Sequence, residues 1–150
     1  MKIKQKKPVF WLKAKKDLCK KDNKLANIIR KYPENYLYSR SDPFYTLARS
    51  IVGQQISVKA AQSIWNKLIY KCPKITPKNL LKIHYMTLKS VGLSKQKILY
   101  LKNLSKAFLQ KKIDPSKWSR LSDESIINEL ISIKGIGRWT AEMYLIFNLS

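Results

Sequence analysis

Helix-start signals recur along this chain and constrain its fold more than any other feature. A capping residue directly precedes proline at Asp42-Pro43, Thr76-Pro77 and Asp114-Pro115. Proline suits the first position of a helix because its missing N–H would have no partner there. Other capping residues precede apolar segments of helical period, and these are Asp22, Ser57, Ser94 and Ser122. Because no alternating apolar and polar run is long enough for a strand, we predict an all-α fold.

The apolar spacing indicates which helix faces turn inward. One face of the first long helix, which Gly53 ends or bends, carries Phe44, Leu47, Ala48 and Ile51. After Ser94, the apolar spacing predicts a buried stripe of Ile98, Leu101, Leu104 and Phe108, and solvent exposure of Lys95, Lys97, Lys102 and Lys106. After Asp22, a short helix that closes at Tyr32-Pro33 is expected to bury Leu25, Ile28 and Ile29.

The charge of the chain indicates its class of partner. Lys and Arg number 31 against 9 Asp and Glu, so the net charge is +22 and the sequence pI is about 10.1. Such an imbalance costs self-repulsion unless an anionic partner relieves it, which favours nucleic acid. The simpler alternative is a solvated surface filled with lysine. Neither a membrane-spanning run nor a signal peptide is evident, so we expect no membrane partner and a cytoplasmic location in a bacterial-type cell.

The metal-ligating residues are few. Cys19, Cys72 and His84 are the only cysteines and the only histidine, so neither a disulfide framework nor a four-cysteine iron–sulfur site can form. A single histidine on an amphipathic segment is more often a packing or surface residue than a ligand. We therefore expect no metal and no cofactor.

A glycine-rich turn near the end of the chain is the strongest functional signal. It is flanked by two helical segments, so we predict a helical hairpin over about residues 122–147. Gly135 and Gly137 stand on either side of Ile136, between Lys134 and Arg138. Two glycines so spaced let the backbone approach a surface closely and direct N–H groups outward at a helix N-terminus, which suits a phosphate. An ordinary turn between two helices is the alternative.

Three separated segments resemble one enzyme family. They are residues 42–63 around Gly53-Gln54-Gln55-Ile56-Ser57, residues 91–97, and residues 130–147. In order and spacing they are similar to the DNA-3-methyladenine glycosylase II family, within the helix-hairpin-helix/GPD superfamily of base-excision repair. The similarity runs from about residue 22 to residue 150. The resemblance therefore implies a helix-hairpin-helix/GPD domain over residues 22–150, preceded by a basic segment over residues 1–21.

The family also implies roles for individual residues. The hairpin residues Gly135, Ile136 and Gly137 would hold a DNA phosphate, with Lys134 and Arg138 adding charge on either side. The turn from Gly53 to Ser57 would enter the duplex where a damaged nucleotide has left, which places Gln55 at the wedge, with Gln54 and Ser57 beside it. Trp139 would form the floor of the base pocket, and core packing is the alternative for this side chain. Relatives that also cut the strand carry Lys at the Trp139 position, so a monofunctional glycosylase is implied.

The resemblance also implies a catalytic aspartate that this sequence lacks. In the family the Asp follows the second hairpin helix, so its position would lie beyond Ser150, and we expect a domain that is truncated at its C-terminus. We name no catalytic residue. The interpretation is a DNA N-glycosylase that removes alkylated bases such as 3-methyladenine by hydrolysis, acting as a monomer on double-stranded DNA. The alternatives are a non-enzymatic, sequence-independent DNA-binding module and, less favoured, a basic protein- or RNA-binding helical domain.

Overall fold

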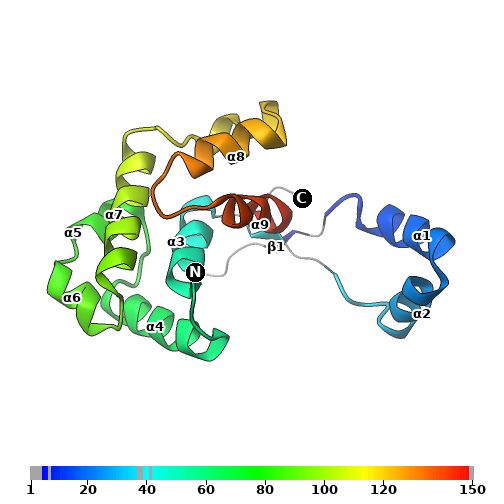
Figure 1. The fold of residues 1–150 in the computed structure, drawn as a ribbon, viewed down its shortest axis with the longest axis horizontal. Helices are drawn as coiled ribbons and strands as arrows, with labels where there is room; N and C mark the ends of the chain where they lie inside the picture. Colours follow the sequence, from blue (N-terminus) through cyan, green and yellow to red (C-terminus); the bar gives the residue numbers. More distant parts are fainter. Residues whose placement is uncertain (1–4, 7, 37–38, 41, 149–150) are drawn as a thin grey trace. The chain divides into compact units, whose positions relative to one another are not determined.

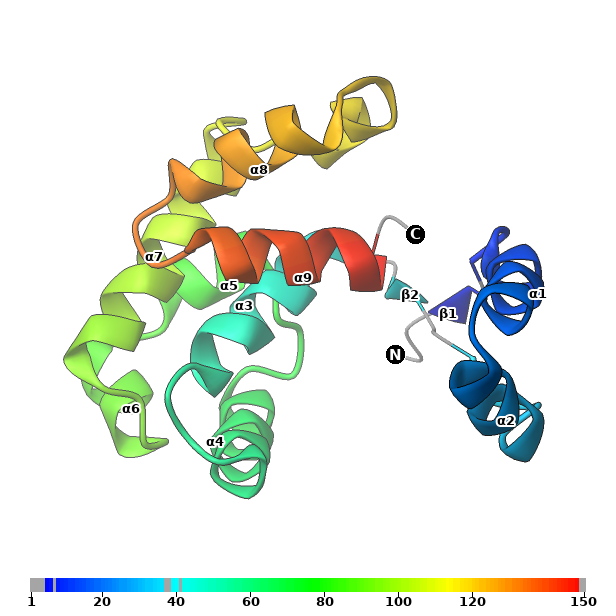
Figure 2. The ribbon, with the colours of Figure 1, turned by 45° about the vertical axis from the view of Figure 1, so that its right-hand side comes forward.

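The computed structural model describes residues 5–6, 8–36, 39–40 and 42–148, and these are almost entirely helical (Figures 1 and 2). The helices are α1 (Trp11–Lys21), α2 (Asn23–Lys31), α3 (Pro43–Gly53), α4 (Val58–Lys71), α5 (Pro77–Lys82), α6 (Tyr85–Ser90), α7 (Lys95–Leu109), a 3-10 helix η1 (Pro115–Arg120), α8 (Asp123–Ile131) and α9 (Arg138–Asn148). Within the described residues the only strands are β1 (Gln5–Lys6) and β2 (Ser39–Arg40), which pair antiparallel. The prediction of an all-α fold is confirmed.

The expected capping residues begin the helices that the sequence indicated. Asp42 accepts the backbone N–H of Tyr45 and Ser57 accepts that of Ala60. The same interaction occurs at the caps Asp22, Thr76, Ser94, Asp114 and Ser122. Each of these side chains satisfies a backbone donor that the helix itself cannot pair. The local signals therefore placed these helix starts correctly.

Helix α7 lies at the centre of one compact unit, residues 42–144. It packs against α3, α5 and α6, and α3 in turn packs against α4. The fully buried side chains of this unit include Leu47, Leu68, Leu80, Leu101 and Leu104. Burial of this apolar surface is the main source of stability for such a helical unit. Two of the four α7 lysines that the sequence placed in solvent, Lys97 and Lys102, instead donate from their amines to backbone carbonyls.

The second unit contains residues 1–41 and 145–150, and within it α1 packs on α2. Residues 1–21, which are predicted to form a basic segment before the domain, include helix α1. The expected burial on α2 was wrong for two of the three residues, because Leu25 is 38% and Ile28 is 56% exposed. Ile29 is half-buried, and Ala26 is the buried residue of this helix. The apolar pattern of α2 is real, but the described residues do not cover that face. Part of the expected basic segment, residues 1–4 and 7, lies outside the described residues.

The described residues contain neither a membrane-spanning helix nor a cluster of metal-ligating side chains. No helix there combines the length and the apolar character needed to cross a membrane. In the same part of the chain, no three His, Cys, Asp or Glu side chains come together in a way that could hold a metal ion. The side chain of His84 accepts the N–H of Met86 at the start of α6.

Candidate nucleic-acid interface

The two helices of the predicted hairpin are α8 and α9, and a short turn joins them (Figure 2). They span residues 123–148, close to the expected 122–147. Gly135 lies in this turn with φ +108°, a left-handed conformation that L side chains rarely adopt. A Cβ at this position would also collide with the ring of Tyr100 on α7. Both the backbone conformation and the packing therefore require glycine at position 135.

Gly137 differs from Gly135, because nothing in the fold requires a glycine there. A Cβ at this position would meet no heavy atom within 4 Å, and its φ is not in the left-handed region. Gly137 is exposed and directly precedes α9, whereas Ile136 beside it is only 4% exposed. The buried Ile136 anchors the turn. The turn consequently presents an open backbone at the N-terminus of an 11-residue helix, where N–H groups and the helix dipole favour an anion.

The segment between α3 and α4 forms a second exposed turn. Gln55 has φ +57°, which is uncommon for a residue other than glycine, and its side chain is exposed. Gln54 is half-buried, and its amide Nε2 donates to the carbonyl of Gly135 over 2.9 Å. Ser57 is exposed and its hydroxyl caps α4. The structure thus joins two of the predicted DNA-contacting segments, which are 81 residues apart in sequence.

A pocket of about 410 Å³ lies where these two turns meet the start of α7. It is lined by Gln54, Gln55, Ser94, Gln96, Lys97, Tyr100, Gly135, Ile136 and Gly137. The Nζ of Lys97 donates to the carbonyl of Val52 over 2.7 Å, and partial burial lowers the pKa of this amine. Sequence analysis missed Lys97 and Tyr100 as parts of the site. Their spacing of three residues, which places both on one side of α7, is the signal that could have indicated them.

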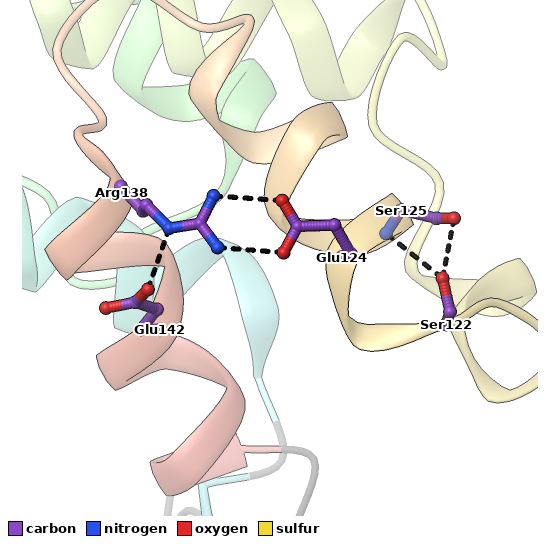
Figure 3. Close-up of polar contacts among 5 residues, drawn as sticks. All are labelled: Ser122, Glu124, Ser125, Arg138 and Glu142. Atoms are coloured by element: carbon purple, nitrogen blue, oxygen red, sulfur yellow. Dashed lines mark hydrogen bonds and ion pairs between the residues drawn. The ribbon is translucent and has the colours of Figure 1, made fainter.

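Arg138 was expected to add charge beside the phosphate, and its guanidinium contacts two carboxylates (Figure 3). Nη1 and Nη2 donate to Glu124 of α8 over 2.9 and 2.8 Å, and Nε donates to Glu142 over 3.0 Å. The hydrogen bonds from Arg138 lower the pKa of Glu124, and the two carboxylates raise the pKa of Arg138. Arg138 thereby connects the two helices of the hairpin. Lys134, on the other side of the turn, is exposed.

Trp139, the expected floor of the base pocket, lies in the first turn of α9. Its side chain is 69% exposed, so core packing does not account for it. The aromatic residues that α9 and η1 do bury are Tyr144 and Trp118, whose rings meet edge to face at 5.3 Å. A large aromatic face therefore remains available next to the glycine turn, and its role as a base platform stays a prediction.

Comparison of the sequence with known proteins identifies relatives. Residues 48–143 match the family described as HhH-GPD superfamily base excision DNA repair protein. The chain is 34% identical over 131 residues to DNA-3-methyladenine glycosylase 1 of Schizosaccharomyces pombe, covering 85% of this chain and 58% of the relative. It is 33% identical over 146 residues to the alkylbase DNA glycosidase-like protein of the same yeast, covering 93% of this chain and 68% of that relative. The chain thus spans between 58% and 68% of the length of these two relatives.

Solved structures show the same fold. The 3-methyladenine DNA glycosylase of Schizosaccharomyces pombe in complex with abasic DNA superposes with a TM-score of 0.80 at 33% identity, over 92% of this chain and 70% of that one. The DNA-3-methyladenine glycosidase of Bacillus halodurans superposes with a TM-score of 0.71 at 33% identity, over 74% of this chain and 52% of that one.

Proposed function

The chain belongs to the HhH-GPD superfamily of base excision DNA repair proteins. We propose that it is a monofunctional DNA N-glycosylase by family, of the kind that removes alkylated bases such as 3-methyladenine, and that the part of the chain that the structure describes binds the duplex. The bond broken would be the N-glycosidic bond, by hydrolysis. The names of the relatives support this substrate class, and they favour a glycosylase over a non-enzymatic DNA-binding module. The observation that carries the proposal is the open glycine turn beside the Gln54–Gln55 turn, on a chain of net charge +22.

The hairpin would bind the DNA backbone. The space that a Cβ of residue 137 would enter is open, so a phosphate can approach the backbone at the N-terminus of α9 closely. Backbone N–H groups bind phosphate irrespective of base sequence, which suits an enzyme that must search all of the DNA. Lys134 is exposed at the same turn and adds positive charge.

Trp139 would select the base. A 3-methyladenine base carries a positive charge, and an electron-rich indole face attracts a cation more strongly than it attracts a neutral base. Damaged bases also pair and stack less well, so they leave the duplex at lower cost. An indole cannot form a Schiff base, which supports a monofunctional glycosylase. The partner proposed is double-stranded DNA that contains alkylated bases, bound by a monomer, and the place of action is the cytoplasm of a bacterial-type cell, at the chromosome.

Substituting the two hairpin glycines one at a time tests the phosphate grip. Gly137→Leu should keep a cooperative thermal melt, because its side chain enters open space. It should weaken duplex binding about tenfold for every sequence tested and lower the salt slope by about one, because one phosphate contact is lost. Fluorescence anisotropy at several salt concentrations measures both quantities.

Gly135→Ala is the matched comparison. It should lower the melting temperature as well as DNA binding, because the left-handed backbone and Tyr100 exclude a Cβ. If Gly137→Leu binds duplexes as the unaltered chain does at every salt concentration, the hairpin is only a turn between two helices and the proposed grip is wrong.

A further inference from the structure

The side chain of Gln54 connects the two segments that the proposed function assigns to DNA. Its Nε2 donates to the carbonyl oxygen of Gly135 over 2.9 Å. Gln54 adjoins Gln55, and Gly135 is two residues from Gly137. A single amide thus fixes the separation between the residue that would enter the duplex and the backbone that would hold the phosphate.

Both ends of this connection are themselves held by α7. On the hairpin side, Tyr100 packs on Gly135 so closely that no Cβ fits there. On the other side, the Nζ of Lys97 donates to the carbonyl of Val52 in the last turn of α3. Lys97 and Tyr100 are three residues apart, so one helix face supports both segments. Only the Gln54 side chain runs directly from one turn to the other among the hydrogen bonds of the described residues.

The hydrogen bond from Gln54 also stabilises the unusual backbone conformation of Gln55. Its φ of +57° is a conformation that a free chain seldom populates at a residue with a side chain. The neighbouring hydrogen bond from Gln54 restricts the turn and so reduces the entropy that Gln55 must lose when it enters DNA.

We propose that Gln54 is a positioning residue that sets the preference of this protein for duplexes with a vacant base position. The inference rests on the proposed function. The phosphate contact is available on any duplex, whereas insertion of Gln55 strengthens binding only where a base has left the stack. Because Gln54 holds the two at one separation, the phosphate contact places Gln55 at the vacancy. Without the Gln54 side chain, the phosphate contact remains, but Gln55 is no longer placed at the vacant base position.

The test compares Gln54→Leu and Gln54→Asn with Gln62→Leu as a control. Leucine removes the amide, and asparagine retains it but falls short of Gly135. Gln62 lies on α4, where its amide contacts Arg49 and Asn66. Anisotropy is measured on an undamaged duplex and on the same duplex with a tetrahydrofuran abasic-site analogue. Fluorescence of 2-aminopurine opposite the analogue reports insertion.

Both Gln54 variants should lose less binding on the undamaged duplex than on the abasic duplex, with the same salt slope as the unaltered chain. Their preference for the abasic duplex should fall about fivefold, the range expected for one hydrogen bond, and the 2-aminopurine response should shrink. Gln55→Ala should reduce the preference in the unaltered chain but add little in the Gln54→Leu background, because the two residues act together. Gln62→Leu should leave the preference unchanged.

Several results would overturn the inference. They are an unchanged preference in both Gln54 variants, additive effects of Gln54→Leu and Gln55→Ala, or an equal loss of binding on both duplexes. Loss of a cooperative melt in both Gln54 variants would also overturn it, because Gln54 would then be a structural residue. Failure of the proposed function is a different result: the unaltered chain would bind neither duplex at low salt.

Discussion

The guanidinium of Arg138, the first residue of α9, is shared between two carboxylates. Glu124 accepts from both terminal nitrogens and Glu142 accepts from Nε. One positive and two negative charges meet there, so the cluster as a whole is negative at the end of the hairpin where a phosphate would approach. Lys134, in contrast, forms no ion pair with any described acid. Of the two cations that flank the glycine turn, Lys134 and not Arg138 is therefore available to contact DNA.

A charge-neutral pair of substitutions separates these two cations. The double variant Arg138→Gln with Glu124→Gln removes one charge of each sign, so the net charge is unchanged. It should bind duplex DNA within twofold of the unaltered chain, because the pair is already neutralised. Lys134→Gln should weaken binding about threefold to tenfold at low salt and lower the salt slope by about one. If the double variant weakens binding as much as Lys134→Gln, Arg138 leaves its carboxylates to contact the phosphate.

At the scale of the helices, what the sequence predicted depended on how local the signal was. Capping is decided within three residues, so the starts of α3, α4 and α7 could be predicted from Asp42, Ser57 and Ser94. Helix α1 begins after Phe10, which makes no side-chain cap, and it was not predicted. The glycine turn itself was visible, but the contacts of Gly135 with Tyr100 and Gln54 were not, because they join segments far apart in sequence.

The contacts of the α7 lysines could not be predicted either, because they also join segments far apart in sequence. One of these lysines, Lys102, gives a prediction about stability. The Nζ of Lys102 donates to the carbonyls of Leu80, Leu81 and Ile83 over 3.0, 2.6 and 2.7 Å. These carbonyls belong to the end of α5, where a helix leaves its last acceptors unpaired. Burial lowers the pKa of Lys102, with repulsion from Lys106 adding to it, so the gain from these bonds is partly offset.

Lys102→Met should therefore lower the free energy of unfolding by about 1 kcal/mol, which urea denaturation measures. Lys106→Met on the same helix is the control, because Lys106 is exposed, and it should change stability by less than about 0.5 kcal/mol. Equal effects of the two substitutions would contradict a capping role for Lys102.

At the scale of the whole molecule, all parts of the candidate interface belong to the unit of residues 42–144. The family match over residues 48–143 falls within the same unit. The pocket between the two turns is lined by amides, hydroxyls, an amine and backbone, and none of these described residues is acidic. The lining of this pocket is thus equipped to bind an anionic backbone, and two carboxylates of the hairpin helices, Glu124 and Glu142, contact Arg138.

The acidic side chains decide what the 150-residue chain can do to a bound base. Of its nine acids, most already have structural partners: Asp22, Asp42 and Asp114 cap helices, Glu124 and Glu142 contact Arg138, and Glu129 accepts from Trp118. The family resemblance implies a carboxylate beside the sugar, and in a dry pocket such a charge contributes roughly a thousandfold or more to the rate.

We therefore predict that the 150-residue chain binds methylated duplex DNA at low salt but releases 3-methyladenine and 7-methylguanine near the uncatalysed rate. Chromatography of the released bases measures this rate. Appending the segment that follows the hairpin in the Schizosaccharomyces pombe relative should restore release, because that segment would bring the aspartate that the resemblance implies. Changing that Asp to Asn should abolish release again while leaving duplex binding intact. Saturable release by the 150 residues alone would contradict the prediction. Because Asp123 is an exposed acid in the first turn of the hairpin helix α8, its substitution by Asn would then be the first test for the carboxylate that reaches the sugar.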